Sequence, residues 1–163
     1  GDMVKITGVI YTARDAAHKR MLENLHKGIA LPVDLKDQTI YFAGPAPAKP
    51  NEPIGSVGPT TSYRMDAYSP ETIELGLTCM IGKGARSKEV VDAMKKYGAV
   101  YIGAVGGAGA LISQCVKKCE VVDYADLGSE AIHRLEVVDF PGIVIIDSQG
   151  NNLYETEPPK YKK

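Results

Sequence analysis

The residues best suited to chemistry lie in the stretch 58–66, which reads Gly-Pro-Thr-Thr-Ser-Tyr-Arg-Met-Asp. Pro59 fixes its own φ and favours extended backbone before it, so the hydroxyl of Thr60 follows a stiff approach to a short helix. Backbone N–H groups at a helix start, together with the guanidinium of Arg64, suit an anion. The stretch therefore predicts an anion site. The alternative is that a threonine caps the helix while Arg64 pairs with Asp66 in solvent.

Two further cations lie where an anionic ligand would meet them. Arg14 falls in the first turn of a helix that Thr12 is predicted to cap, and a cation is unfavourable at that end of the helix dipole. Lys83 lies between two glycines where a strand gives way to a helix, the place at which α/β proteins bind ligands. Each has a simpler alternative, which is local pairing of Arg14 with Asp15 and a solvent-exposed loop position for Lys83.

The segments that must position these residues alternate between strand-like and helix-like patterns. Strands are predicted over residues 4–11, 39–43, 77–81, 99–102, 121–124, 132–140 and 142–147, the last turning into residues 152–154 as a hairpin. Helices are predicted between Thr12 and Gly28, from an N-cap at Ser69 to Gly76, and from a cap at Ser87 to Gly98. Strand and helix alternation in the middle, with β-rich ends, predicts an α/β fold that mixes parallel and antiparallel pairing.

Two connections stand out between these elements. The proline-rich residues 44–53 predict a long ordered loop, which in a compact domain is usually functional, and this loop leads directly to the 58–66 stretch. The glycine-rich residues 103–110 lead into a helix predicted to run through Lys118. That turn, with Asp123 beyond it, offers a second interpretation as a nucleotide- or metabolite-binding module, although its spacing matches neither phosphate-loop motif.

The composition bounds the class of protein. A chain of 163 residues with 44% hydrophobic and 24% charged residues fits one globular domain over residues 1–163. No apolar run approaches the roughly 20 residues of a membrane span, and the start lacks a signal-peptide core, so we expect a cytoplasmic protein. A net charge of −1 gives no reason to expect nucleic acid, and His133 within a strand is interpreted as structural.

The three cysteines argue against a metal centre on this chain. Cys79, Cys115 and Cys119 fall in apolar or amphipathic segments, which is typical of buried thiols in a reducing compartment. Cys115 and Cys119 would be one helical turn apart, but neither a CxxC pair nor a suitably spaced histidine accompanies them. The sequence predicts no metal ligands.

Several segments together resemble the C-terminal domain of class I fumarases and the β subunits of two-chain fumarases and L-tartrate dehydratases. They are residues 11–18 (Tyr-Thr-Ala-Arg-Asp-Ala-Ala-His), 58–66, 82–87 (Gly-Lys-Gly-Ala-Arg-Ser), 101–107, 126–132 and 137–141, so the likeness covers nearly the whole chain. The resemblance implies a three-layer swivelling β/β/α domain. It also implies a hydro-lyase that hydrates fumarate reversibly to L-malate, with L-tartrate dehydratase as the alternative.

The resemblance assigns roles to four residues. The substrate-binding arginine of the family falls on Arg14, the first threonine of its GPTT motif, proposed there as the catalytic base, on Thr60, and the arginine before Met-Asp on Arg64. The lysine of its KG-x-RS motif falls on Lys83. A four-carbon dicarboxylate needs two separated cationic sites, which these cations would supply from three loops.

Two positions depart from the family pattern. Tyr63 stands where fumarases usually have glycine, and Ala85 where they tend to have asparagine. Both departures bear on substrate preference more than on the type of reaction.

The resemblance also implies what this chain needs from others. In the family a separate α subunit carries a [4Fe-4S] cluster, which accounts for the absence of cluster ligands here. The expected partners are therefore that α subunit, in a hetero-oligomer with a shared active-site cleft, and a dicarboxylate substrate. A homo-oligomer is the alternative for the isolated chain.

Overall fold

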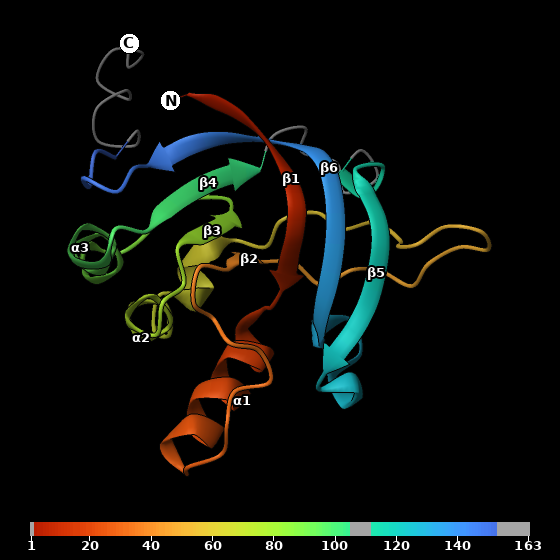
Figure 1. Ribbon diagram of the computed structural model, residues 1–163, viewed down its shortest axis with the longest axis horizontal. Helices are drawn as coiled ribbons and strands as arrows, with labels where there is room; N and C mark the ends of the chain where they lie inside the picture. Colours follow the sequence, from red (N-terminus) through yellow and green to blue (C-terminus); the bar gives the residue numbers. More distant parts are fainter. Residues whose placement is uncertain (1, 105–111, 153–163) are drawn as a thin grey trace.

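The computed structural model describes residues 2–104 and 112–152 (Figure 1). The elements, in order, are β1 (Met3–Thr12), α1 (Asp15–His26), β2 (Thr39–Tyr41), the 3-10 turn η1 (Ser62–Met65), α2 (Ser69–Glu74), β3 (Cys79–Gly82), α3 (Lys88–Tyr97), β4 (Val100–Ala104), β5 (Val116–Asp123), the 3-10 turn η2 (Ala125–Glu130) and β6 (Ile132–Ile146). The predicted α/β class is confirmed. No helix of the described residues has the length and apolar character to cross a membrane.

The sheet combines a parallel part and an antiparallel part, as predicted. Strands β1, β2, β3 and β4 lie side by side and parallel, so their carboxyl ends share one edge. The long strand β6 runs antiparallel to β4, β5 and β1. Since β6 pairs with both β4 and β1, the hydrogen-bonded path β1-β2-β3-β4-β6 returns to its start, with β5 attached outside it.

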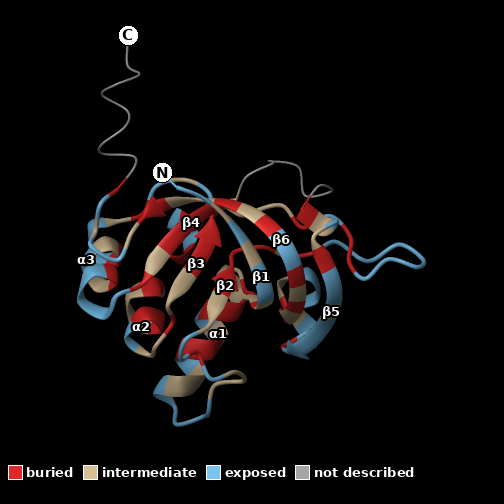
Figure 2. Ribbon diagram, turned by 45° about the horizontal axis from the view of Figure 1, so that its top comes forward, coloured by how far each residue is buried: buried red, intermediate tan, exposed pale blue. Residues whose placement is uncertain are grey.

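Successive side chains along the short parallel strands point to opposite faces of the sheet, and each face carries an apolar core. Ile40, Met80 and Tyr101 point into one core, which α1, α2 and α3 cover. The next residue along each strand points into the other core, where β6, β5 and residues 54–57 close over it; these residues are Tyr41, Ile81 and Ile102. Figure 2 shows this burial as red segments along the central strands, with exposed residues on the outer sides of α3 and β5.

The helix boundaries follow the predictions closely, with two corrections. Ser87 accepts a hydrogen bond from the Val90 N–H and Gly98 ends α3 in the left-handed conformation, as predicted. Thr12 is the last residue of β1 rather than a cap, because its hydroxyl bonds the backbone N–H of His133 across the sheet. Ser69 is the first residue of α2 rather than its cap, because Tyr68 occupies the N-cap position and the helix begins one residue earlier than predicted.

The largest error in the predicted elements lies after the glycine turn. Residues 116–123 form strand β5, paired antiparallel with β6, where the sequence predicted a helix through Lys118. Their β-branched valines favour a strand once β6 offers an edge to pair with. Cys119 therefore lies on a strand, and it does not share a helix with Cys115. The rest of the predicted glycine turn, which follows Ala104, lies outside the described residues.

The two predicted strands at the end of the chain are one strand. Strand β6 continues through Pro141, which pairs with Lys5 of β1. The break expected at the proline is a local bulge instead, where Asp139 adopts a φ of 54° and its N–H donates to the Thr7 hydroxyl. The predicted terminal hairpin is present as far as Asn152, which pairs with Ile146.

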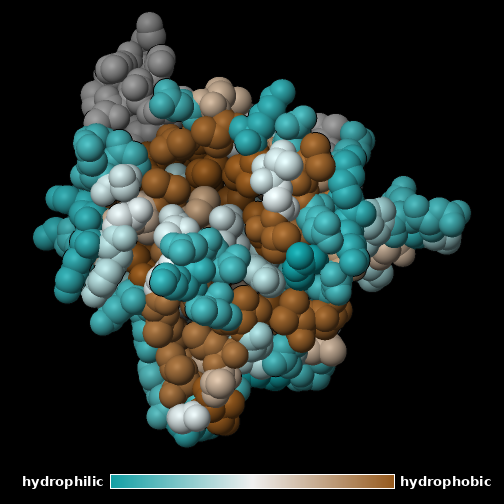
Figure 3. All heavy atoms as spheres, in the orientation of Figure 1, coloured by the Kyte–Doolittle hydropathy of each residue, from teal (hydrophilic) through white to brown (hydrophobic). Residues whose placement is uncertain are grey.

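The proline-rich loop is confirmed as a segment without helix or strand. Residues 46–53 are all exposed and project from the body of the molecule as an arm, drawn in orange to gold in Figure 1. Hydrogen bonds between Ala46 and Ser56 and between Gly55 and Ala46 close its base. Hydrophilic side chains cover most of the arm in Figure 3, whereas apolar side chains gather over the centre of the same face and over α1.

Candidate active site at the carboxyl edge of the parallel strands

The 58–66 stretch is anchored to the ends of two parallel strands. The Thr60 N–H donates to the Phe42 carbonyl just beyond β2 at 2.7 Å, and the Ser62 N–H donates to the Lys83 carbonyl just beyond β3 at 2.8 Å. Thr61 forms a parallel bridge with Lys83. The stretch therefore continues the sheet at its carboxyl edge before it turns into η1.

The other two candidate residues lie at the same edge. Arg14 is the N-cap of α1, two residues beyond the end of β1, and Lys83 directly follows β3. Because β1, β2 and β3 are neighbours and parallel, Arg14, Thr60 and Lys83 follow the carboxyl ends of three adjacent strands. Arg64 comes from η1, which begins at this edge. All four residues singled out from the sequence thus belong to one edge of the sheet.

Three of these side chains have no intramolecular partner in the part of the chain that the structure describes. Arg64 and Lys83 are exposed and Thr60 is half-buried, and none of the three makes a side-chain hydrogen bond or ion pair with another described residue. Thr61 occupies the N-cap position of η1, as one alternative expected, but its side chain makes no cap hydrogen bond. The alternative pairing of Arg64 with Asp66 is wrong, because Asp66 binds Arg86.

Arg14 lies near two carboxylates but does not form a close hydrogen-bonded pair with either of them. Its Nε lies 3.9 Å from carboxylate oxygens of both Asp15 and Glu130, and this buried Nε makes no hydrogen bond with a described residue. A Cβ added to Gly44 would lie 3.1 Å from the Arg14 Cδ, so the start of the proline-rich loop packs against this side chain. Arg14 therefore keeps hydrogen-bonding capacity for an anion.

Beneath these residues lies a second layer in which every polar group is paired. We call Arg14, Thr60, Arg64 and Lys83 the outer set, and Ser62, Asp66, Arg86 and Tyr101 the inner set. The Arg86 Nε donates to Asp66 Oδ1 at 2.8 Å, and Asp66 Oδ2 accepts the Ser87 N–H at 2.8 Å. The guanidinium also lies 5.1 Å from the ring centre of Phe42 and 5.0 Å from that of Tyr101. The inner set thus ties the 58–66 stretch to the loop that carries Lys83.

His18 supports the Arg14 end of the site. It is fully buried, and its Nδ1 lies 2.8 Å from the Arg14 carbonyl, so the Nδ1–H tautomer donates to that oxygen. Burial lowers the pKa of His18 to about 4, with the Arg86 guanidinium acting in the same direction. His18 is therefore neutral near pH 7, and it packs between the rings of Phe42 and Tyr68.

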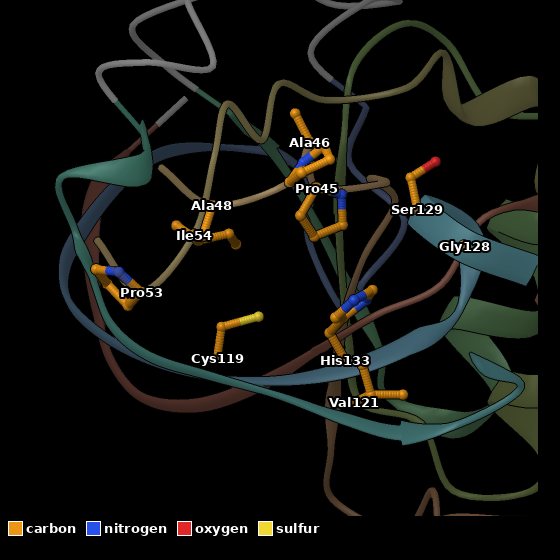
Figure 4. Close-up of a pocket in the computed structure, with 11 residues that line it drawn as sticks. Pro45, Ala46, Ala48, Pro53, Ile54, Cys119, Val121, Gly128, Ser129 and His133 are labelled. Carbon is orange, nitrogen blue, oxygen red and sulfur yellow. The ribbon is translucent and has the colours of Figure 1, made fainter. Parts of the chain in front are cut away.

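A separate cleft of about 350 Å³ opens between the proline-rich loop and strands β5 and β6 (Figure 4). Its lining includes Pro45, Ile54, Cys119, Ser129 and His133, all labelled in Figure 4. Burial lowers the pKa of His133, whose Nδ1 bonds the Ala131 carbonyl, in agreement with its predicted structural role. The cleft has no cation in its lining, so we assign the anion site to the outer set.

The described residues do not fit a metal cluster. They contain no group of three or more histidine, cysteine or acidic side chains with the geometry of a metal site. Burial raises the pKa of Cys79 to about 11 and also raises that of Cys119, which disfavours the thiolate forms that bind metals. The expectation that this chain supplies no metal ligands stays a prediction.

Signals for the inner set and for His18 are weaker in the sequence. Asp66, Arg86 and His18 stand inside the motifs that carry the outer set, but a charged residue near a predicted ligand site is ordinarily interpreted as solvent-exposed. Their burial became visible only when the loops were brought together. Tyr101 gave no functional signal, because an aromatic residue in an apolar strand predicts only a core position.

Comparisons with known proteins give matches over nearly the whole chain. A family model described as fumarase C-terminus matches residues 1–157. The Leishmania major protein named fumarate hydratase 1, mitochondrial, is 43% identical over 93% of this chain, and the aerobic class I fumarate hydratase of Escherichia coli K12 is 41% identical over 93%. The chain spans only 28% of the length of each. A putative L(+)-tartrate dehydratase subunit beta from Methanocaldococcus jannaschii is 44% identical over 95% of this chain and 83% of its own length.

Proposed function

Because the chain belongs to the family of fumarase C-terminal domains, we propose that it is the β subunit of a two-chain hydro-lyase that hydrates fumarate reversibly to L-malate. The observation that carries this proposal is the outer set, in which three cations and a hydroxyl lie at the carboxyl edge of adjacent parallel strands. Arg64, Lys83 and Thr60 have no partners among the described residues, so they are available to a ligand.

The outer set suits a dicarboxylate. Two carboxylates at opposite ends of a four-carbon chain need separated cations, and Arg14 and Lys83 follow strands β1 and β3, with β2 between them. Arg64 adds a planar guanidinium close to Thr60 in the sequence. In this arrangement the cations orient the substrate, and its carbon atoms come to rest against the hydroxyl of Thr60.

Thr60 is the group proposed to move the proton. Hydration adds hydroxide to one carbon of the double bond and a proton to its neighbour, and the reverse reaction removes that proton. A threonine hydroxyl is by itself a very weak base, so this role requires the neighbouring cations to stabilise its ionised form. The location of Thr60 between Phe42 and the Lys83 loop supports this assignment.

The activation of water belongs to a partner in this proposal. An iron-sulfur cluster would act as a Lewis acid toward the hydroxyl being added, and the described residues of this chain do not provide ligands for one. We therefore assign the [4Fe-4S] cluster to a separate α subunit and derive no step through it. The substrate would lie in a cleft between that subunit and the carboxyl edge of this chain.

We further propose that the chain acts as one swivelling domain of three layers over residues 1–163. Two apolar cores on opposite faces of the parallel strands support the layers, with α1, α2 and α3 on one side and β6 with β5 on the other. A rigid body of this kind can carry the outer set toward or away from a partner as a unit.

L-tartrate is the second candidate substrate. The specific observation in its favour is the archaeal subunit beta, which this chain matches over most of both lengths. Tyr63 is 66% exposed directly beside Arg64, so a bulky phenol borders the proposed site and bears on which dicarboxylate fits.

The test is anaerobic co-expression with the α subunit, followed by assays on fumarate, L-malate and L-tartrate. The isolated chain is expected to be iron-free and inactive, and activity should appear only in the assembled enzyme. Lys83→Met and Arg14→Met should each raise KM or lower turnover in that enzyme, because loss of one charge-assisted partner costs about 2–5 kcal/mol when the other charge is desolvated. Hydratase activity in the isolated chain, or normal kinetics in both variants, would disprove the proposal.

A further inference from the structure

The two loops that carry Thr60 and Lys83 are joined by the side chain of Tyr101. Its hydroxyl lies 2.8 Å from the Ser62 Oγ and 2.8 Å from the Gly84 carbonyl oxygen. Ser62 lies two residues after Thr60, and Gly84 directly follows Lys83. One phenol oxygen therefore bridges the two segments that hold the proposed acid-base group and one of the carboxylate-binding cations.

The direction of each hydrogen bond follows from the chemistry of the groups. A carbonyl oxygen can only accept, so Tyr101 donates its proton to Gly84, and the Ser62 hydroxyl must then donate to the phenol oxygen. Tyr101 and Ser62 are both fully buried, so water does not reach either side chain. The two bonds together fix the direction of both hydroxyl protons.

The surroundings of the bridge hold it in place. A Cβ added to Gly82 would collide with the Ser62 hydroxyl, so the close approach of that hydroxyl to β3 requires a glycine at this position. Gly84 has a φ of +87°, a left-handed conformation that suits glycine. The buried Arg86 guanidinium packs on the Tyr101 ring at 5.0 Å and thus restrains the phenol from the side.

We propose that Tyr101 is a positioning residue, whose hydroxyl fixes the distance between Lys83 and the Thr60–Arg64 segment without contact with the substrate. This inference rests on the proposed function, because it assigns Tyr101 to the alignment of that site. The backbone bond from the Ser62 N–H to the Lys83 carbonyl sets the register of the two segments, and the phenol bridge restrains the loop beyond Lys83. A misplacement of about 1 Å in such a group can cost roughly 100-fold in rate.

The test removes one oxygen atom. Tyr101→Phe in the enzyme assembled with its α subunit is expected to lower kcat/KM by about 10- to 100-fold per folded molecule. Ser62→Ala breaks the same bridge from the other side, so the double variant should lose little more than the more damaging single variant. Thr78→Val is the matched control, because it deletes a hydroxyl-to-carbonyl bond at the opposite end of β3, where Thr78 donates to Gln38.

A second measurement does not depend on activity. Hydrogen-deuterium exchange in the full chain should become faster over residues 82–87 in Tyr101→Phe and should be unchanged there in Thr78→Val. Unchanged exchange over this loop, or a kcat/KM as high as that of Thr78→Val, would overturn the positioning role. Lys83→Met and Arg14→Met separate the two hypotheses. If they impair turnover and Tyr101→Phe does not, only the positioning role fails, and if neither of them has an effect, both hypotheses fail.

Discussion

The outer and inner sets use the same chemical groups in opposite ways. Lys83 and Arg86 are three residues apart in one loop, yet the side chain of Lys83 extends into solvent and that of Arg86 is fully buried against Asp66. Thr60 and Ser62 differ in the same manner, since only the Ser62 hydroxyl has a partner among the described residues. A polar group that is buried and fully paired maintains the structure, whereas one left unpaired at a strand end is available to a ligand. The two sets should therefore respond to mutation differently.

The largest effect is expected at Thr60 in the outer set. Thr60→Val keeps the β-branched shape and removes the hydroxyl, so kcat of the assembled enzyme should fall by roughly 10²- to 10⁴-fold with thermal stability nearly unchanged. Thr61→Val is the matched control and should retain most activity, and Thr60→Ser should be partly active. A near-normal kcat in Thr60→Val would show that the Thr60 hydroxyl has a structural role and no catalytic one.

In the inner set, Arg86→Met should destabilise the fold rather than only slow the reaction. It leaves the largely buried Asp66 carboxylate without its cation, and loss of one member of such a pair costs about 3–5 kcal/mol in the free energy of unfolding. Urea denaturation measures this cost. Arg20→Met breaks the surface pair with Asp126 and should leave stability almost unchanged, so equal losses in the two variants would contradict the comparison.

His18 links the two sets, and its effect depends on pH. Its pKa is about 4 in the folded protein and 6.5 as a free side chain, so the unfolded chain binds the proton more tightly. The stabilisation is complete above pH 6.5 and is lost as pH falls toward 4, by about 3 kcal/mol in total. Unfolding measured between pH 4 and 7 should show this slope in the parent and a smaller one in His18→Phe. Identical slopes would exclude His18 as its source.

The smallest effect on stability is expected at Arg64. Its side chain is exposed and has no partner within the described residues, so Arg64→Met should change the free energy of unfolding by no more than about 0.5 kcal/mol. The same variant should bind dicarboxylate more weakly in the assembled enzyme. Thermal denaturation checks the expected stability, and a substrate titration checks the expected loss of binding. A large loss of stability would mean that Arg64 belongs with the inner set.

The sequence was most informative where local chemistry decides the structure. Ser87 and Gly98 delimit α3 because cap and stop signals act within a few residues, and Lys83 follows a strand as its flanking glycines indicated. It was wrong where distant pairing decides, as for β5, whose strand depends on β6, and for Thr12, whose hydroxyl bonds a residue 121 positions away. The outer set was identified from its motifs, whereas the pairing within the inner set depends on two loops and strand β4 meeting in space.

Closure of the β1-β2-β3-β4-β6 path has a kinetic consequence. Strand β1 opens the described chain and pairs with β6 through contacts such as Thr12 with His133, which lie 121 residues apart. Such contacts form only after most of the chain has lost its freedom, so they slow the search for the native state. During synthesis at about 5–20 residues per second, β1 would wait several seconds or more for its antiparallel partner to leave the ribosome. Its apolar residues lack their native cover throughout that interval, so this is the stage at which the strand is most prone to aggregate.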